Sequence, residues 1–256
     1  MPGSGGAEPV AGWDQRRTSF GSVAPRYAAL RPPYPPDAVA ALLGPAPLRV
    51  LDLGAGTGLL TDQLLAAGHD VVAVDPSVPM LEQLSARHPG VPTRVGEAEA
   101  VPLPDADVDA VVAGQAAHWF DPGPASAELR RVLRPGGVVG LVWNTRDERV
   151  GWVAALGAAL AEEARGHQAD AEVVDRFAAA LPADVVQHTS QVVQRLTPGQ
   201  VVEGIATRSY VATMSPARRA EFLGGLHDLL ARHPDTAGLA ELELPYVTRA
   251  VRLTPR

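Results

Sequence analysis

The chain reads VLDLGAGTG at residues 50–58, where a short apolar run carries one acidic residue and ends in alternating glycines. A second apolar run at 71–74 ends in Asp75. Glycine has no Cβ, so a glycine-rich turn lets the backbone approach a ligand closely. A carboxylate at the end of the next strand can accept both hydroxyls of a ribose. The two segments therefore predict a nucleoside-binding site on a parallel sheet.

The spacing of the glycines distinguishes between nucleoside cofactors. A dinucleotide site follows the pattern G-x-G-x-x-G, whose third glycine would fall at position 59, where the chain has Leu59. The glycines stand instead at Gly54, Gly56 and Gly58, in the pattern G-x-G-x-G. This spacing, following the acidic Asp52, resembles the first motif of the class I S-adenosylmethionine-dependent methyltransferases.

Length and composition favour a single α/β domain. The chain has 256 residues, of which 46% are hydrophobic and 5% aromatic, so its core must consist mainly of Ala, Val and Leu. Such residues suit parallel strands that are buried on both faces. The chain has no cysteine, which excludes disulfides, a thiolate nucleophile and a sulfur-ligated metal. It also has no lysine, which excludes Schiff-base chemistry.

Charge and hydropathy limit the possible partners. The net charge of −7 argues against a nucleic-acid partner. The first residues lack the charged and apolar regions of a signal peptide, and no apolar run approaches the length of a membrane span. The histidines lack metal-ligand spacing, so no metal site is expected. We expect a cytoplasmic protein, monomeric or homodimeric, and the Ala- and Arg-rich composition is typical of a bacterial source.

Strands and helices are predicted to alternate through the first part of the chain. The predicted strands lie at 49–53, 71–75, 93–96, 108–114 and 138–143. The predicted helices lie at 37–43 with Asp37 as the cap, at 59–67, at 77–88 with Ser77 as the cap, and at 125–133. Later segments predict helices at 151–165, 170–181, 198–207 and 215–233, and strands at 190–196 and 246–253. Alternation of this kind implies βαβ units with right-handed crossovers.

These elements predict a Rossmann-like, doubly wound α/β fold. We expect a mostly parallel seven-stranded sheet with an antiparallel last strand and a helical cap insertion. The expected divisions of this single domain are a flexible N-terminal arm or lid at 1–36, a cofactor-binding core at 37–147, a helical cap with the second half of the sheet at 148–240, and a closing strand at 241–256.

The resemblance implies how S-adenosylmethionine would bind, with S-adenosylhomocysteine as the product. Asp52 would accept a hydrogen bond from the ammonium group, and the helix N-terminus after the glycines would face the carboxylate. Glu97 would accept from the adenine amine, and Met80 would lie against the adenine or in the core. The implied cofactor contacts are Asp52, Gly54, Ala55, Gly56, Gly58, Asp75, Pro76, Met80, Glu97, Ala98 and Gln115.

A narrower resemblance rests on three further segments. The pattern Tyr-x-x-x-Arg-Pro-x-Tyr-Pro at 27–35, the run at 115–121 and the run at 129–137 are similar to a subgroup related to the trans-aconitate and ubiquinone/menaquinone methyltransferases. The likeness covers roughly residues 20–147.

The subgroup resemblance also indicates candidates for the acceptor side of the site. His118 is a candidate general base, because its ordinary pKa lies near neutrality, or else a structural histidine that shapes the loop. Trp119 can line the site or belong to the core. The remaining substrate candidates are Tyr27, Arg31, Asn144 and Arg146, and the arginines, together with Arg208, could hold an anionic substrate.

The function expected from these residues is methyl transfer to an O, N or C atom of a small-molecule acceptor by SN2 displacement. Three alternatives stay open. One is a non-catalytic module that binds the cofactor, and another is an enzyme that uses the bound sulfonium only as an electrostatic catalyst. The third, an NAD-dependent oxidoreductase, is disfavoured by the glycine spacing and by the acidic pair Asp75 and Glu97. No motif in the sequence identifies the acceptor.

Overall fold

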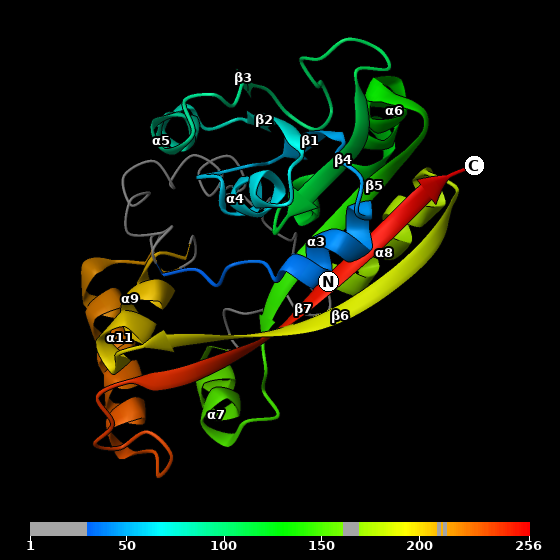
Figure 1. The fold of residues 1–256 in the computed structure, drawn as a ribbon. Coiled ribbons are helices and arrows are strands. Elements are labelled where there is room, and N and C mark those ends of the chain that lie inside the picture. The colour runs from blue at the N-terminus through cyan, green and yellow to red at the C-terminus, as the bar shows by residue number, and fades with distance from the viewer. Residues whose placement is uncertain (1–29, 161–168, 209–210, 212–213) are drawn as a thin grey trace, which may run out of the picture.

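A computed structural model of the chain describes residues 30–160, 169–208, 211 and 214–256. Its seven-stranded sheet has the order β3-β2-β1-β4-β5-β7-β6 (Figure 1). The strands are β1 Arg49–Leu53, β2 Asp70–Asp75, β3 Thr93–Val95, β4 Val108–Gly114, β5 Leu133–Arg146, β6 Ala183–Leu196 and β7 Leu242–Pro255. The pairs from β3 to β5 are parallel, and β7 runs antiparallel to both β5 and β6. The predicted mostly parallel sheet with an antiparallel last strand is confirmed.

Helices cover both faces of the sheet. They are α3 Pro36–Leu43, α4 Leu59–Ala66, α5 Val78–Arg87, the short 3-10 helix η2 Ala117–Trp119, α6 Pro122–Val132, α7 Gly151–Leu160, α8 Ala169–Ala180, α9 Pro198–Ala206 and α11 Pro216–Arg232. Side chains of a strand alternate between its faces. Val50 of β1 therefore packs with α3 and α4, whereas Leu51 and Leu53 pack on the side of α6 and α8. This is the doubly wound arrangement that the sequence predicts.

A third apolar cluster lies where β6 ends and β7 begins. Helices α7, α9 and α11 gather there, around Leu196 and Leu242, which are paired in register (Figure 1). Helix α8 lies elsewhere, packed beside α6 on the main sheet, and contributes Phe177 to that core. No helix in the described part of the chain combines the length and the apolar character that a membrane span requires.

Several predicted boundaries were wrong, each for an identifiable reason. Asp37 is not the cap of α3, since Pro35 precedes the helix, and the Asp37 carboxylate instead accepts hydrogen bonds from Ser190 (2.8 Å) and His188 (3.1 Å) of β6. Helix α6 begins before the predicted residue 125 because the Asp121 carboxylate accepts from Gly123 N. Strands β6 and β7 both extend further than predicted. The start of β6 was missed because β6 is a largely exposed edge strand whose first half carries no apolar alternation.

Candidate functional site

The glycine turn between β1 and α4 has backbone torsion angles that residues other than glycine adopt only with strain. The φ angles of Gly54, Gly56 and Gly58 are +71°, +56° and +89°. A Cβ on Gly54 would lie 2.6 Å from the Cβ of Ala116, and one on Gly58 would lie 2.9 Å from Leu84. The turn therefore requires glycine both for its torsion angles and for its close packing.

Asp75 fixes this turn to the end of β2. Its Oδ2 accepts a hydrogen bond from Gly56 N and its Oδ1 accepts one from Ser77 N, each at 2.8 Å. The residue is buried, and burial raises the pKa of its carboxyl. A carboxylate can accept about four hydrogen bonds, so both oxygens retain capacity for a ligand. Asp75 thus shapes the glycine turn and can still bind hydroxyl groups beside it.

Asp52 is a second carboxylate beneath the same turn. It is 0% exposed, and its Oδ2 accepts a hydrogen bond from the Thr61 hydroxyl of α4 at 2.6 Å. Burial raises the pKa of Asp52 to about 7, and the charge of Asp75 adds to the rise. The other oxygen, Oδ1, is buried with no hydrogen-bond partner among the described residues. A buried acceptor of this kind fits a cationic ligand group at the glycine turn.

The raised pKa of Asp52 predicts a specific pH dependence of stability. Because the folded pKa lies above the unfolded value, Asp52 binds a proton more tightly in the folded state, and its contribution to stability falls as the pH rises from about 4 to about 7. Asp52→Asn keeps an acceptor for Thr61 but cannot ionise. We expect the variant to gain stability relative to wild type on going from pH 4 to pH 8, as measured by urea unfolding. An equal difference at both pH values would contradict the raised pKa, and Asp70→Asn at the opposite end of β2 is the control.

The segment after β3 approaches the same site from the edge of the sheet. Gly96 N donates to the carbonyl of Asp75 at 3.3 Å, which places exposed Glu97 and buried Ala98 next to the end of β2. Arg131 of α6 holds the following loop by donating to the carbonyls of Val101 and Leu103. The structure thus brings the predicted adenine-side residues to one edge of the glycine turn.

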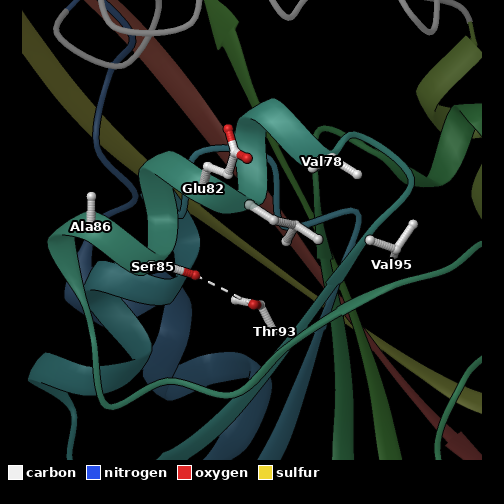
Figure 2. A pocket seen from close by; sticks show the side chains of 7 residues that line it. Val78, Glu82, Ser85, Ala86, Thr93 and Val95 are labelled. Atoms are coloured by element: carbon white, nitrogen blue, oxygen red, sulfur yellow. Dashed lines mark hydrogen bonds between the residues drawn. The ribbon is translucent and has the colours of Figure 1, made fainter.

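Met80 and Pro76 are the remaining predicted adenine-side residues, and a hollow near them is not part of the predicted cofactor site. Met80 is buried, and its sulfur lies 3.5 Å from where a Cβ on Gly56 would stand, whereas Pro76 is exposed. An open hollow of about 440 Å³ lies between α5 and β3. Figure 2 shows two of its lining residues, Ser85 and Thr93, joined by a hydrogen bond. The predicted cofactor residues do not line this hollow.

Gln115 follows β4 at the point where the strand order reverses, the usual ligand position in such sheets. It has a φ of +54°, and its Nε2 donates to the carbonyl of Asn144 at 2.7 Å. Asn144 in turn donates to the carbonyls of Pro32 and Pro33, both at 3.3 Å, and accepts from Thr248. Asn144 therefore ties the segment before α3 to the end of β5.

His118 lies on η2, which follows Gln115 shortly after the end of β4. Burial lowers its pKa to about 4, and its Nδ1 is buried without a hydrogen-bond partner in the described residues. Its ring lies 5.0 Å from that of half-buried Trp119, measured between centroids. Phe120 packs edge-on against Phe177 of α8. The histidine is therefore neutral at physiological pH, and the loop that carries it is fixed to the core.

The charges of the predicted substrate arginines act on one residue, Tyr246. Burial raises the pKa of the Tyr246 hydroxyl, and the nearby charges of Arg146, Arg208 and Arg31 oppose that rise. Arg146 is itself buried at the end of β5. The remaining substrate candidate, Tyr27, lies outside the described residues.

Comparison with known proteins identifies the family. Residues 51–141 match the family model described as a methyltransferase domain. An uncharacterised methyltransferase of Mycobacterium tuberculosis is 48% identical over 237 residues, which cover 92% of this chain and 95% of that protein. The chain belongs to the class I methyltransferases.

Two further proteins show how the similarity is distributed. This methyltransferase shares its fold with a candidate type II methyltransferase of Anaeromyxobacter dehalogenans, with a TM-score of 0.67, 28% identity, and coverage of 88% of this chain and 97% of that chain. A malonyl-[acyl-carrier protein] O-methyltransferase of Methylococcus capsulatus is 41% identical over 130 residues, or 46% of this chain and 47% of that protein. The first match spans nearly the whole fold, and the second only about half of it.

Sequence reasoning missed three features of the methyltransferase site. Thr61 binds Asp52 from the first turns of α4, and no pattern marked that threonine in advance. The Tyr34 hydroxyl lies 2.7 Å from where a Cβ on Gly114 would stand, although both residues belong to segments that the sequence singled out. Tyr246 was predicted only as the start of a strand, and its place opposite Arg146 follows from strand register.

Proposed function

We propose that this methyltransferase transfers the methyl group of S-adenosylmethionine to an O, N or C atom of a small-molecule acceptor. The observation that supports this most strongly is the glycine turn, which is bound by Asp75 and follows Asp52, whose buried Oδ1 has no hydrogen-bond partner among the described residues. A cationic amino-acid ammonium suits the Asp52 oxygen, and a ribose suits the spare acceptor capacity of Asp75. Both groups occur in S-adenosylmethionine.

The other cofactor contacts are proposed from their places around the turn. The N-terminus of α4 would hold the carboxylate through backbone N–H groups. Ala55, whose own N–H donates to the carbonyl of Val74, would border the same part of the cofactor. Glu97, Ala98, Met80 and Pro76 would surround the adenine. Gln115, at the strand reversal, would border the methionine part of the cofactor.

When bound, S-adenosylmethionine supplies an activated methyl group for in-line displacement by the acceptor. The protein must then position the acceptor and exclude water, and these two effects can supply much of the acceleration. We propose that the segment before α3 and helices α7, α9 and α11 cover the acceptor side of the site. Arg31, Asn144, Arg146 and Trp119, together with Tyr27, are the proposed acceptor contacts.

His118 is proposed to accept a proton from the acceptor. With a pKa of about 4, it is too weak a base to ionise a hydroxyl or amine beforehand. For a hydroxyl acceptor, it can take the proton once the new bond from oxygen to the methyl carbon has made that proton strongly acidic.

His118→Gln tests this role. The variant is expected to bind S-adenosylmethionine with wild-type affinity and to lower kcat by about 10²-fold. Because the imidazole is neutral above about pH 5, wild-type kcat should show no His118 ionisation between pH 6 and 8. Near-wild-type turnover of the variant would reduce His118 to a residue that shapes the pocket.

The proposed function is tested with a methyl-deuterated donor. The protein is incubated with deuterated S-adenosylmethionine and a bacterial small-molecule extract, and products are sought by mass spectrometry. A labelled product that depends on Asp75 supports methyl transfer. Tight donor binding without any labelled product would favour the non-catalytic module or an electrostatic role of the sulfonium.

A further inference from the structure

Strand β6 forms one edge of the sheet. It is the last strand in the sheet order, and no described strand lies beyond it (Figure 1). An edge strand turns every second N–H and C=O away from the sheet, where another strand can bind them. Three of the six exposed large apolar side chains among the described residues also lie on β6: Val185 (40% exposed), Val186 (61%) and Val193 (52%). This edge therefore combines available backbone groups with apolar side chains.

The middle of β6 lacks the residues that commonly protect an edge strand from pairing. Residues 185–193 contain no Asp, Glu, Lys, Arg or Pro. Asp37 of α3 reaches the segment from one face, but its carboxylate is occupied by hydrogen bonds from Ser190 and His188. Neither a charged side chain of the segment nor a missing N–H group therefore opposes the addition of another strand.

The same segment has nearly the same sequence in both directions. It reads VVQHTSQVV, which is palindromic about Thr189 except at positions 188 and 190. Two antiparallel copies of a strand can be related by a two-fold axis perpendicular to the sheet, and opposed residues then lie at equal distances on either side of the axis. With the axis at Thr189, the opposed pairs are Val185 with Val193, Val186 with Val192, Gln187 with Gln191, and His188 with Ser190.

Neighbouring positions of the axis lack this match. An axis at residue 188 would set Val186 opposite Ser190, and an axis at residue 190 would set Val186 opposite Gln194. Apolar β-branched side chains that lie directly opposite one another stabilise an antiparallel pair. Because side chains alternate along a strand, the axis at Thr189 creates contacts between valines on both faces of the sheet.

We propose that the chain forms a two-fold dimer in which β6 pairs antiparallel with β6 of a second copy, centred on Thr189. The two sheets then join into one continuous sheet, and the outward N–H and C=O groups of residues 185–193 gain partners. Strands β4, β5 and β7 separate β6 from β1, which leads into the glycine turn. Dimer formation therefore does not depend on binding of the methyl donor.

Disulfide trapping tests the register directly, because the chain has no cysteine. In the dimer, Thr189 faces its own copy with Cα atoms about 4.5–5.5 Å apart, a separation that suits a disulfide. Oxidised Thr189→Cys should form a covalent dimer of twice the 26.7 kDa of the chain. Val185→Cys is the matched control on the same strand face, since its Cα would lie about 26 Å from its copy. It should crosslink only when mixed with Val193→Cys.

Sedimentation velocity of the full chain measures the affinity of the dimer. We expect a concentration-dependent dimer in the micromolar range, which Thr189→Glu weakens by about 100-fold or more because two carboxylates would face each other. Val95→Glu, on β3 at the opposite edge of the sheet, is the control and should dimerise as wild type does. Circular dichroism checks that each variant is folded, and the cysteine variants keep the test informative if Thr189→Glu is not.

Three outcomes would overturn the proposal. The first is a wild type that stays monomeric throughout the micromolar range, which would leave this edge to a different partner. The second is equal crosslinking of Thr189→Cys and of Val185→Cys alone. The third is a dimer that Val95→Glu dissociates and Thr189→Glu does not.

Discussion

Gly54→Ala is expected to abolish detectable binding of S-adenosylmethionine and to lower the stability of the fold. The residue has a φ of +71°, which costs a non-glycine residue about 1–2 kcal/mol. The new Cβ would also lie 2.6 Å from the Cβ of Ala116, an atom attached directly to the backbone after β4. Relief of that clash must move the glycine turn or the Gln115 loop, and both belong to the proposed donor site. Calorimetry and thermal unfolding measure the two effects.

Gly68→Ala is the matched control for this substitution. Gly68 has a φ of +84°, but a Cβ there would meet no atom within 4 Å. The control therefore carries the torsional cost alone, about 1 kcal/mol, and should keep wild-type donor affinity. Equal affinity of Gly54→Ala and Gly68→Ala would show that the turn does not form the donor site.

Asp75→Asn is expected to weaken donor binding by about 10- to 100-fold. Both carboxylate oxygens accept backbone N–H groups, and hydrogen bonds to a charged group contribute about 1.5–3 kcal/mol each. An asparagine amide would turn its NH2 group towards either Gly56 N or Ser77 N, so one donor would face another. The turn would loosen, and the proposed ribose contact would be lost with it.

Asp70→Asn controls for the loss of a negative charge on the same strand. Asp70 begins β2 and forms an exposed ion pair with Arg49, far from the glycine turn along the strand. The Asp70→Asn variant should bind the donor with wild-type affinity. If Asp75→Asn also retained full affinity in calorimetric titrations, Asp75 would have only a structural role.

The sequence predicts the first half of the fold well because its signals are local. Parallel strands such as β1 and β2 are continuous apolar runs, and the glycine pattern at residues 54–58 reflects torsion angles that follow from those residues alone. The same locality explains why the turn and Asp75 could be predicted to lie together: they end neighbouring parallel strands.

Features that depend on distant contacts could not be predicted. The exposed half of β6 forms through pairing with β7, and Asp37 binds Ser190 rather than its own helix. The position of Arg146 opposite Tyr246 depends on the register between β5 and β7. Each depends on residues far apart in the chain, for which a single sequence carries no pattern.

The most direct test of the central claim is a calorimetric titration of the purified protein with S-adenosylmethionine and, separately, with NAD and NADH. We predict saturable, one-to-one binding of S-adenosylmethionine that Asp75→Asn weakens, and no binding of either dinucleotide. Binding of NAD or NADH without binding of S-adenosylmethionine would contradict the proposed function.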